Sequence, residues 1–404
     1  MVYAQQGRQI LDLIVGFKIS PILWKHIVSN TKNSLSAGRC QTPALRLVYD
    51  NYKEIQASPG KLSFNTTGIF TGKNIIFPLN YNHLSHDEIK EFLELSKTHK
   101  YILSKETEKQ TKKNPPSPFT TSGLQQSANN IMHISPKDTM ALAQKLYEGG
   151  YITYMRTDSK VYSEEFIKNG TDYITDNYNK DYINPNIGLI TQSLEKVDKK
   201  EEKNKSKKKK EENNNAQEAH EAIRPTNILV ESIPEDEDIF TARHRKLYKL
   251  IWNNTAIYKQ LVVKISAPQK QIYKYSAEEN IFPGWKAIQG VDDDKYYIYL
   301  QNLKEGPIIA NKIISKQTLK DLKSHYTEAK LVQLLEQKGI GRPSTFSSLI
   351  DKIQERQYVK RENVEGKKLE IIDYTLEDGN INTERGEKEF GNEKNKLVIT
   401  QTGV

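Results

Sequence analysis

The chain has 404 residues, a formal net charge of +9 and a single cysteine, Cys40. A chain of this length is expected to form about two to four domains, and its positive charge favours a polyanionic partner. One cysteine excludes a disulfide framework and a cysteine-based zinc site within the chain, and the lack of an apolar run of about 18 residues excludes a transmembrane helix.

Residues 1–58 are predicted to be helical. An apolar stripe at helical spacing ends near Gly16, so the first helix is expected to end there. Ser20 followed by Pro21 has the pattern of an N-cap and a first-turn proline, which predicts that a second helix begins at this point.

A third helix is predicted to begin near Pro43, directly after the small residues of 34–42. The free N–H groups at a helix N-terminus bind phosphate readily. Arg39 and Gln41 are therefore candidates to hold a backbone phosphate and a base edge. On these residues alone, an ordinary capped turn remains the alternative.

Two blocks of strands are predicted, on either side of a helical insert. Residues 61–82 alternate between apolar and polar side chains, and residues 259–314 include the strand-like segments 261–265 and 296–300. This order predicts one β domain that is interrupted by another domain. The run Asp292–Asp294 favours a hairpin turn over a metal site, because aspartate is common in turns.

The insert begins with a proline-rich segment, residues 112–119, and Thr120 then has the character of an N-cap that opens a helix. Residues 195–215 are rich in lysine, glutamate and asparagine and have almost no apolar side chains, so they predict a mobile loop. A nuclear-targeting signal is the alternative for the lysine run, but a solvated insertion is favoured.

The centre of the insert is a helix over 139–147 that ends at paired glycines, followed by a predicted strand over 151–155. Because side chains alternate along a strand, Tyr154, Arg156 and Asp158 are expected to lie on one side of it. A phenol, a guanidinium and a carboxylate would then stand in a row. Tyrosine packing and a surface Arg–Asp pair are the structural alternative.

The remainder of the chain is predicted to be helical at two places. Residues 239–258 form an amphipathic pattern. Further on, a helix over 328–336 ends near Gly339, and a second helix runs to Gln357 before a strand-like segment at 358–360. Two short helices joined by a glycine turn favour a helix-turn-helix arrangement.

Four strings in this order resemble the signatures of type IA DNA topoisomerases. The strongest is Leu146–Ser159, with Tyr-Ile-Thr-Tyr-Met-Arg-Thr-Asp-Ser at its end; the others are Leu35–Ala44, Ala219–Thr226 and Gly339–Thr345. The resemblance implies that Tyr154 is the nucleophile, that Arg156 assists it, and that His220 helps to hold the scissile phosphate. The DNA-binding residues implied in the same way are Arg8, Arg39, Gln41, Asp158, Arg224, Thr345 and Arg356. Arg8 falls where the family carries an arginine pair, whose second member is Gln9 here.

The fold expected from this resemblance is mixed α/β (α+β), multidomain and toroidal. The expected segments are a helical DNA-binding domain in two pieces (residues 1–58 and 317–404), a β-rich arch in two pieces (59–110 and 239–316), and an inserted domain that bears the tyrosine (111–238).

The implied chemistry is ATP-independent cleavage, strand passage and religation of single-stranded DNA through a 5′-phosphotyrosine, which relaxes negatively supercoiled DNA. A tyrosine hydroxyl has an ordinary pKa of about 10, so it needs a proton acceptor or a nearby cation at neutral pH. Arg156 can supply that positive charge and stabilise the phosphorane.

Family members also carry a Toprim domain, whose Asp-x-Asp-x-Glu cluster binds Mg²⁺, and no such string occurs in these 404 residues. Mg²⁺ is therefore expected on a Toprim domain, in cis or in trans, and no metal ligands are assigned to this chain. The alternative is a catalytically incomplete remnant that only binds single-stranded DNA. The N-terminal residues lack a signal peptide, so the protein is expected to work inside the cell. A monomer that binds DNA and makes no membrane contact is also expected.

Overall fold

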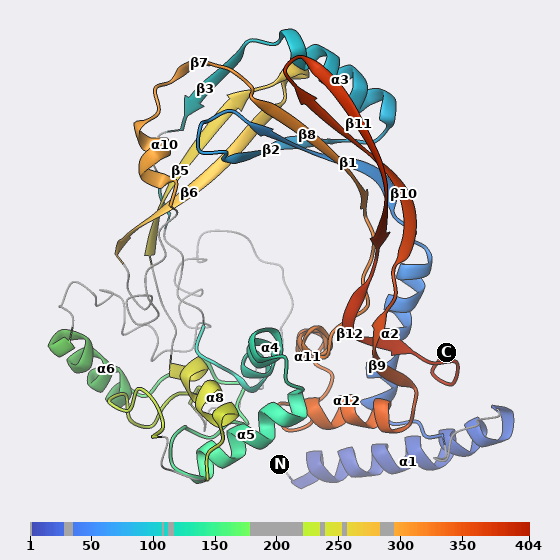
Figure 1. Ribbon diagram of the computed structural model, residues 1–404. Helices are drawn as coiled ribbons and strands as arrows, with labels where there is room; N and C mark the ends of the chain where they lie inside the picture. The colour runs from blue at the N-terminus through green and yellow to red at the C-terminus, as the bar shows by residue number, and fades with distance from the viewer. Residues whose placement is uncertain are drawn as a thin grey trace, which may run out of the picture.

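The computed structural model describes residues 2–27, 35–106, 109–111, 117–177, 221–234, 239–252, 257–282 and 295–404. The elements are arranged as a ring, with a curved sheet at the top, helices at the base, and β10 and β11 forming one side wall (Figure 1). Three separate hydrophobic cores hold this ring together, and each draws on segments that are far apart in the sequence. The toroidal, multidomain α/β expectation is confirmed.

The top of the ring is a ten-stranded sheet, in which the paired neighbours are antiparallel. Its strand order is β11-β10-β8-β1-β2-β6-β5-β3-β7, and β4 pairs with β5. The strands are β1 Lys61–Ile69, β2 Ile76–His83, β3 Tyr101–Lys105, β4 Lys109–Thr111, β5 Ile257–Ser266, β6 Ile272–Phe282, β7 Gly306–Ile308, β8 Lys312–Lys320, β10 Lys367–Glu377 and β11 Asn380–Phe390. Both predicted strand blocks therefore meet in one sheet.

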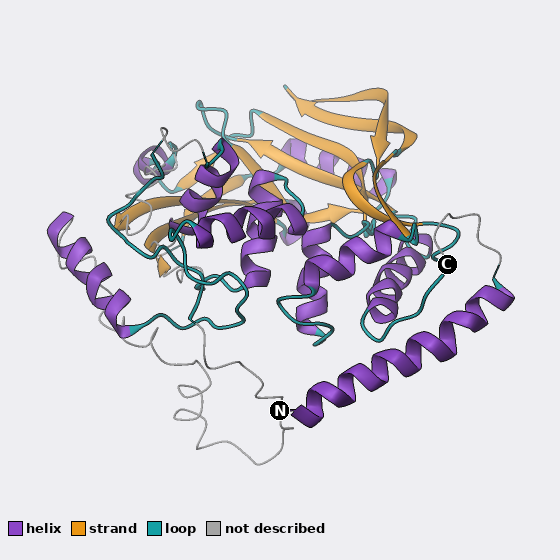
Figure 2. Ribbon diagram, turned by 90° about the horizontal axis from the view of Figure 1, so that it is seen from below, coloured by secondary structure: helices purple, strands orange, loops and turns teal. Residues whose placement is uncertain are grey.

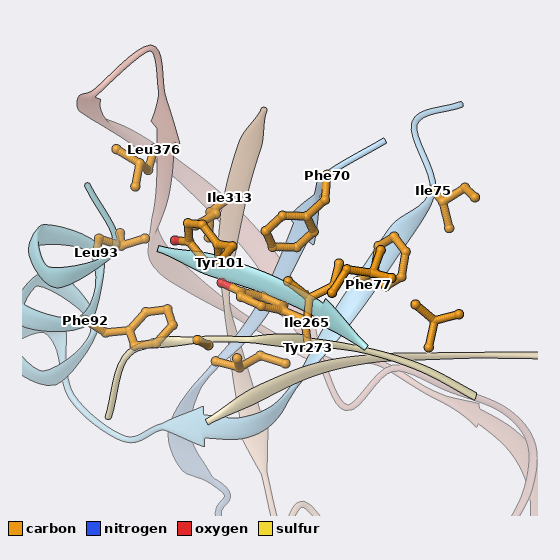
Figure 3. Packing of buried hydrophobic residues seen from close by; sticks show 14 of the residues in the cluster. Phe70, Ile75, Phe77, Phe92, Leu93, Tyr101, Ile265, Tyr273, Ile313 and Leu376 are labelled. Carbon is orange, nitrogen blue, oxygen red and sulfur yellow. The ribbon is translucent and has the colours of Figure 1, made fainter. Parts of the chain in front are cut away.

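The core of the sheet is aromatic, and Figure 3 shows Phe70, Phe77, Tyr101 and Tyr273 packed together. The Phe70 ring lies 5.0 Å from that of Tyr273 and 5.2 Å from that of Tyr101. Helices α3 (His86–Thr98) and α10 (Tyr297–Asn302) and the short 3-10 helix Pro268–Lys270 contribute to this part of the ring. Aromatic pairs with tilted or edge-to-face rings contribute beyond their buried area, so this cluster fixes how the strands sit on one another.

The predicted strand at 296–300 is wrong, because these residues enter helix α10. Tyr297 and Leu300 are both fully buried and lie three residues apart, which is the spacing of one helix face. Alternation of tyrosine and isoleucine is compatible with either element, and the packing of these two side chains decides for the helix.

The hydroxyl of Tyr273 is buried in this core and has no hydrogen-bond partner among the described residues. A polar group that loses water without gaining a partner destabilises the folded state. We expect Tyr273→Phe to raise the free energy of unfolding by about 1 kcal/mol, because it removes only that oxygen. Thermal denaturation of the two proteins measures the change. Destabilisation by Tyr273→Phe would show that the hydroxyl is satisfied in solution.

The second core joins α4 (Thr121–Met132), α5 (Pro136–Glu148), α6 (Glu164–Asn177) and α8 (Ala242–Trp252). The predicted N-cap is confirmed, since the Thr120 hydroxyl accepts a hydrogen bond from the N–H of Gly123 at 3.1 Å. Ser135 caps α5 in the same way. Helix α8 was assigned to the second piece of the arch, yet its buried face packs in this core.

The third core, at the base of the ring, joins α2 (Gln41–Gln56), α11 (Glu328–Gln337), α12 (Phe346–Glu355) and the strand pair β9 (Val359–Val364) and β12 (Glu393–Ile399). The predicted turn between α11 and α12 is confirmed, with Gly339 at φ +64° and Gly341 at φ +84°. The segment 317–404 is not purely helical, because it also supplies β10 and β11 to the sheet.

The prediction of two helices before residue 30 is wrong, because residues 2–26 form one helix, α1 (Val2–His26), with Pro21 inside it. Side chains on both sides of the proline are tied down: Ser20 accepts a hydrogen bond from the N–H of Ala37 at 3.2 Å, and Trp24 donates its indole N–H to the carbonyl of Leu35. These tertiary contacts offset the backbone hydrogen bond that proline cannot make. Figure 2 shows α1, which starts at the N label, along one edge of the base.

Some expectations lie outside the described residues: the loop 195–215, the aspartate run 292–294 and His220. Within the ranges that the structure describes, no helix is both long and apolar enough to cross a membrane.

Candidate active site

The candidate nucleophile lies in the loop between α5 and α6. Helix α5 ends in a Schellman motif: Gly150 has φ +76°, its N–H bonds the carbonyl of Tyr147, and the N–H of Tyr151 bonds the carbonyl of Leu146, both at 2.9 Å. A positive φ is strained for other L-residues, so a glycine at position 150 gives the loop a fixed direction as it leaves the helix. The predicted glycine stop is confirmed.

The predicted strand over 151–155 is wrong. Apart from one isolated bridge between Ile152 and Pro225, the segment has no sheet partner among the described residues. Ile152 and Met155 are both buried in the second core, three residues apart, so the side chains do not alternate. The predicted row of side chains along one strand face is therefore absent, and an irregular loop carries them instead.

A buried threonine holds the backbone of this loop through hydrogen bonds. The hydroxyl of Thr121, at the start of α4, donates to the carbonyl of Met155 at 2.7 Å and accepts from the N–H of Thr157 at 2.9 Å. The N–H of Thr121 also bonds the carbonyl of Thr157 at 2.9 Å. These bonds satisfy backbone groups that a strand ladder would otherwise satisfy.

The segment 222–226 supports the loop from a second side through Thr153. The N–H of Thr153 bonds the carbonyl of Arg224 at 2.9 Å, and the Thr153 hydroxyl donates to the carbonyl of Ala222 at 2.8 Å. The N–H of Arg224 bonds the Thr153 hydroxyl in return at 3.1 Å. The residue next to Tyr154 is thus held by three hydrogen bonds.

Tyr154 itself is half-buried, at the margin of the second core. Its ring meets that of Tyr147 edge to face, with centroids 5.3 Å apart and planes at 67°. This geometry is a favourable one for aromatic pairs and restricts how the phenol can turn. Arg156 follows two residues later with an exposed side chain, and Asp158 is half-buried. A phenol on a fixed loop with a guanidinium nearby in sequence suits nucleophilic attack on a phosphodiester.

Arg224 lies close to the tyrosine loop, but its guanidinium faces inward. It forms a two-point ion pair with Glu221, at 2.8 and 2.7 Å, and stacks over the ring of Phe166 with the guanidinium carbon 4.2 Å from the centroid. The side chain is only 12% exposed. The predicted phosphate contact of Arg224 therefore competes with partners inside the protein.

Arg39 lies in the loop before α2, and Gln41 is the first residue of that helix. Arg39 pairs with Asp12 on α1, with its Nε 3.0 Å from the carboxylate, and this hydrogen bond raises the pKa of the already basic guanidinium. Both side chains are well exposed, at 40% and 50%, so DNA has access to them. Gln41 is buried and donates to the carbonyl of Ser36 at 3.3 Å, and Arg8 is exposed on α1.

The base of the ring brings three of the four signature strings onto neighbouring elements. Tyr358 accepts a hydrogen bond from the N–H of Ser36 at 2.8 Å, which ties the Arg39 loop to the end of α12. Helix α4 packs against α11, and α5 packs against α12, where Lys137 lies 3.6 Å from Asp351. The tyrosine domain therefore contacts the same helices that carry the helix-turn-helix string.

Thr345 and Arg356 mark the two ends of α12. The Thr345 hydroxyl accepts from the N–H of Arg342 at 2.8 Å and is 3.0 Å from the carbonyl of that residue, which closes a tight turn before the helix. Arg356 is half-buried at the C-terminal end. The structure places both residues at the base, on an element that touches α5.

In the part of the chain that the structure describes, no group of three or more His, Cys, Asp or Glu side chains is arranged to hold a metal ion. These residues therefore do not fit the Mg²⁺ site of the family, and no step of the chemistry is assigned to such an ion here.

Several supporting residues were missed by the sequence reasoning: Asp12, Thr121, Tyr147, Thr153 and Tyr358. Asp12 lies four residues after Arg8, so helical spacing was a usable signal for a polar stripe on α1. Tyr147 and Thr153 lie inside the strongest string, but their roles depend on contacts with the rest of the fold. No pattern in the sequence pairs Thr153 with residue 224.

Comparison with known proteins identifies the family. A family model described as DNA topoisomerase matches residues 1–372. The chain is 36% identical to DNA topoisomerase 1 of Buchnera aphidicola over 97% of this chain and 43% of that protein, and 36% identical to the Helicobacter pylori enzyme over 92% and 50%. A mimivirus protein named DNA topoisomerase 1 type prokaryotic is 32% identical over 100% of this chain and 51% of its own length.

Among solved structures, full-length topoisomerase I from Thermotoga maritima matches 89% of this chain and 57% of that chain, with a TM-score of 0.65 and 28% identity. The chain spans about half the length of the curated relatives that it matches. The family model covers the tyrosine loop, both pieces of the arch and the helices at the base. The chain therefore belongs to the type IA DNA topoisomerase family.

Proposed function

We propose that this chain carries the transesterification and DNA-binding parts of a type IA DNA topoisomerase. The observation that carries the proposal is the placement of Tyr154 on a loop that is fixed by Gly150, Thr121 and Thr153, inside a ring-shaped fold of this family. A nucleophile has to be held in position to within a fraction of an ångström for efficient attack, and this loop provides such a mount.

The proposed reaction exchanges one ester bond for another. The Tyr154 oxygen attacks the phosphorus of a single-stranded DNA phosphodiester and loses its proton. The bond from phosphorus to the 3′ oxygen breaks, and that oxygen leaves as a hydroxyl after it gains a proton. The 5′ phosphate stays on the tyrosine. Religation is the reverse attack by the 3′ hydroxyl, so the cycle needs no ATP. Arg156 stabilises the negative charge on the phosphorane.

The direct test is covalent capture. A single-stranded oligonucleotide labelled on the 3′ side of the cleavage position is mixed with this chain and a Toprim domain, and the reaction is stopped with denaturant. A labelled species that migrates with the protein and disappears on protease treatment supports the proposal. A chain that only binds DNA gives no such species.

We also propose that a Toprim domain, in cis or in trans, completes the site and carries Mg²⁺, since the described residues offer no such ligand set. Helix α1 supports a further protein contact, because its large apolar side chains are 41–88% exposed: Tyr3, Ile10, Leu11, Leu13, Ile14, Phe17, Ile19, Ile22 and Trp24. An exposed apolar surface of this extent is typical of a protein–protein contact. We propose a monomer that acts on negatively supercoiled DNA inside the cell.

We propose the domain division predicted from the sequence, with α8 moved to the tyrosine domain.

The proposed contacts to single-stranded DNA are Arg8, Arg39, Gln41, Asp158, Thr345 and Arg356. Arg39 offers the sharpest test of these contacts. We expect Arg39→Ala to weaken binding of a single-stranded oligonucleotide about tenfold, since a charge-assisted contact to phosphate is lost. Fluorescence anisotropy at low salt measures the dissociation constant.

Asp12→Asn is the matched variant for Arg39→Ala. It leaves Arg39 in place but removes its competing carboxylate, so binding is expected to tighten by a few-fold. Arg46→Ala serves as the control, because Arg46 pairs with Asp50 on the same helix that follows the Arg39 loop. Equal weakening by Arg39→Ala and Arg46→Ala would mean that only overall charge matters and that Arg39 makes no specific contact.

A further inference from the structure

The guanidinium of Arg224 is held by several contacts inside the protein, which leave little of it available to bind a phosphate. Its Nε and Nη2 atoms bond the two carboxylate oxygens of Glu221, and its Nη1 donates to the carbonyl of Pro225 at 2.8 Å. The guanidinium face is covered by Phe166. A guanidinium has five N–H donors in a fixed plane, so this arrangement uses both its edge and its face.

The same two residues also join three pieces of chain. Glu221 accepts a hydrogen bond from the N–H of Ser163 at 3.2 Å, and the N–H of Ala222 bonds the carbonyl of Val161 at 2.8 Å, so the start of α6 is held to this segment. The backbone of Arg224 is held to Thr153 by two hydrogen bonds. The ion pair thus lies where the 161–163 segment, the 221–226 segment and the tyrosine loop meet.

We infer that Arg224 is a positioning residue for Tyr154 rather than a DNA contact, and that Glu221 is its partner in this role. The ion pair fixes the 222–226 backbone, this backbone fixes Thr153, and Thr153 precedes the nucleophile. To reach a phosphate, the guanidinium would have to leave both Glu221 and Phe166, and the Glu221 carboxylate would lose its cationic partner. The inference rests on the proposed transesterification, but half of its test is independent of chemistry.

The salt dependence of DNA binding separates the two roles. For single strands, the logarithm of the binding constant falls with the logarithm of salt concentration with a slope of about −0.7 per phosphate contact. Arg224→Gln is expected to leave this slope and the affinity for a single-stranded oligonucleotide unchanged. Arg39→Ala, measured in parallel, is expected to make the slope shallower by about 0.7.

The chemical readout is the single-turnover rate of covalent attachment to a labelled oligonucleotide, with a Toprim domain added. We expect Arg224→Gln and Glu221→Gln each to lower the maximal rate about tenfold, without changing the DNA concentration that gives half the maximal rate. Thr153→Val alters no charge but cuts the side-chain bonds between the two segments, and it is expected to give the same loss. Arg224→Lys, which keeps one bond to Glu221, is expected to lie between Arg224→Gln and the wild type.

A shallower slope in Arg224→Gln, or tighter binding in Glu221→Gln, would show that the guanidinium contacts DNA and would overturn the inference. Unchanged attachment rates in Arg224→Gln, Glu221→Gln and Thr153→Val would overturn it as well. Thermal denaturation checks each variant; if Arg224→Gln does not fold, Thr153→Val and Arg224→Lys still decide the matter. Failure of the wild-type chain to form an adduct would count against the proposed function. The salt dependence of DNA binding in Arg224→Gln would still show whether Arg224 contacts DNA.

Discussion

Tyr154→Phe is expected to abolish covalent attachment of single-stranded DNA, with adduct falling to the background of the assay. The substitution removes one oxygen, and that oxygen is the proposed nucleophile. The ring remains, so its edge-to-face contact with Tyr147 and its place beside the second core should persist. Binding of the same oligonucleotide should change less than about threefold, because no charge is lost. Denaturing gels of the labelled oligonucleotide measure attachment, and anisotropy measures binding.

Tyr151→Phe is the matched control, since Tyr151 lies in the same loop but packs inward against Phe240 and Tyr248. It should keep the adduct at close to the wild-type level. A denaturation-stable adduct that persists in Tyr154→Phe and is lost in Tyr151→Phe would show that Tyr151, and not Tyr154, is the nucleophile. Loss of binding in Tyr154→Phe would mean that its hydroxyl has a structural role.

The helix ends at the site were predictable, because they depend on local chemistry. Thr120 caps α4 and Gly150 ends α5 where the sequence placed a cap and a glycine stop. The turn at Gly339 and Gly341 is of the same kind. In each case a single residue type satisfies a backbone need that lies within a few residues, so the neighbouring sequence is enough to reveal it.

The shape of the tyrosine loop was not predictable from its own residues. Its β-branched and aromatic side chains are strand formers, but Ile152 and Met155 anchor the second core instead. The backbone finds its partners in Thr121 and in residues 222–226, more than 30 and about 70 positions away in the sequence. Contacts of this separation leave no local signal, and they decide whether a segment becomes a strand.

The inward orientation of Arg224 shows the same limit at the level of one side chain. The string around His220 resembles a family signature, and an arginine in such a string suggests a phosphate contact. Its partners are Glu221, three positions earlier, and Phe166, which lies on another element. The nearby carboxylate was visible in the sequence, whereas the aromatic face that completes the site was not.

The chain alone is expected to show no relaxation of negatively supercoiled plasmid, with or without Mg²⁺, and a Toprim domain from a related enzyme is expected to restore it. The described residues include the proposed nucleophile, Tyr154, and in Arg39 and Arg8 they offer exposed cations for DNA, but they contain no carboxylate cluster for a metal ion. The apolar side chains exposed on α1 give an added domain a surface to bury. An agarose gel compares the chain, the Toprim domain and the mixture, and Tyr154→Phe in the mixture is the control.

A further variant, Phe17→Asp, places a charge on α1 at a side chain that is 76% exposed, so folding should survive while the restored relaxation is lost. Robust relaxation by the chain alone would mean that its own carboxylates, with Asp158 and Glu221 the first to replace, serve the reaction. Restoration that is insensitive to Phe17→Asp would instead place the added domain on another face of the ring.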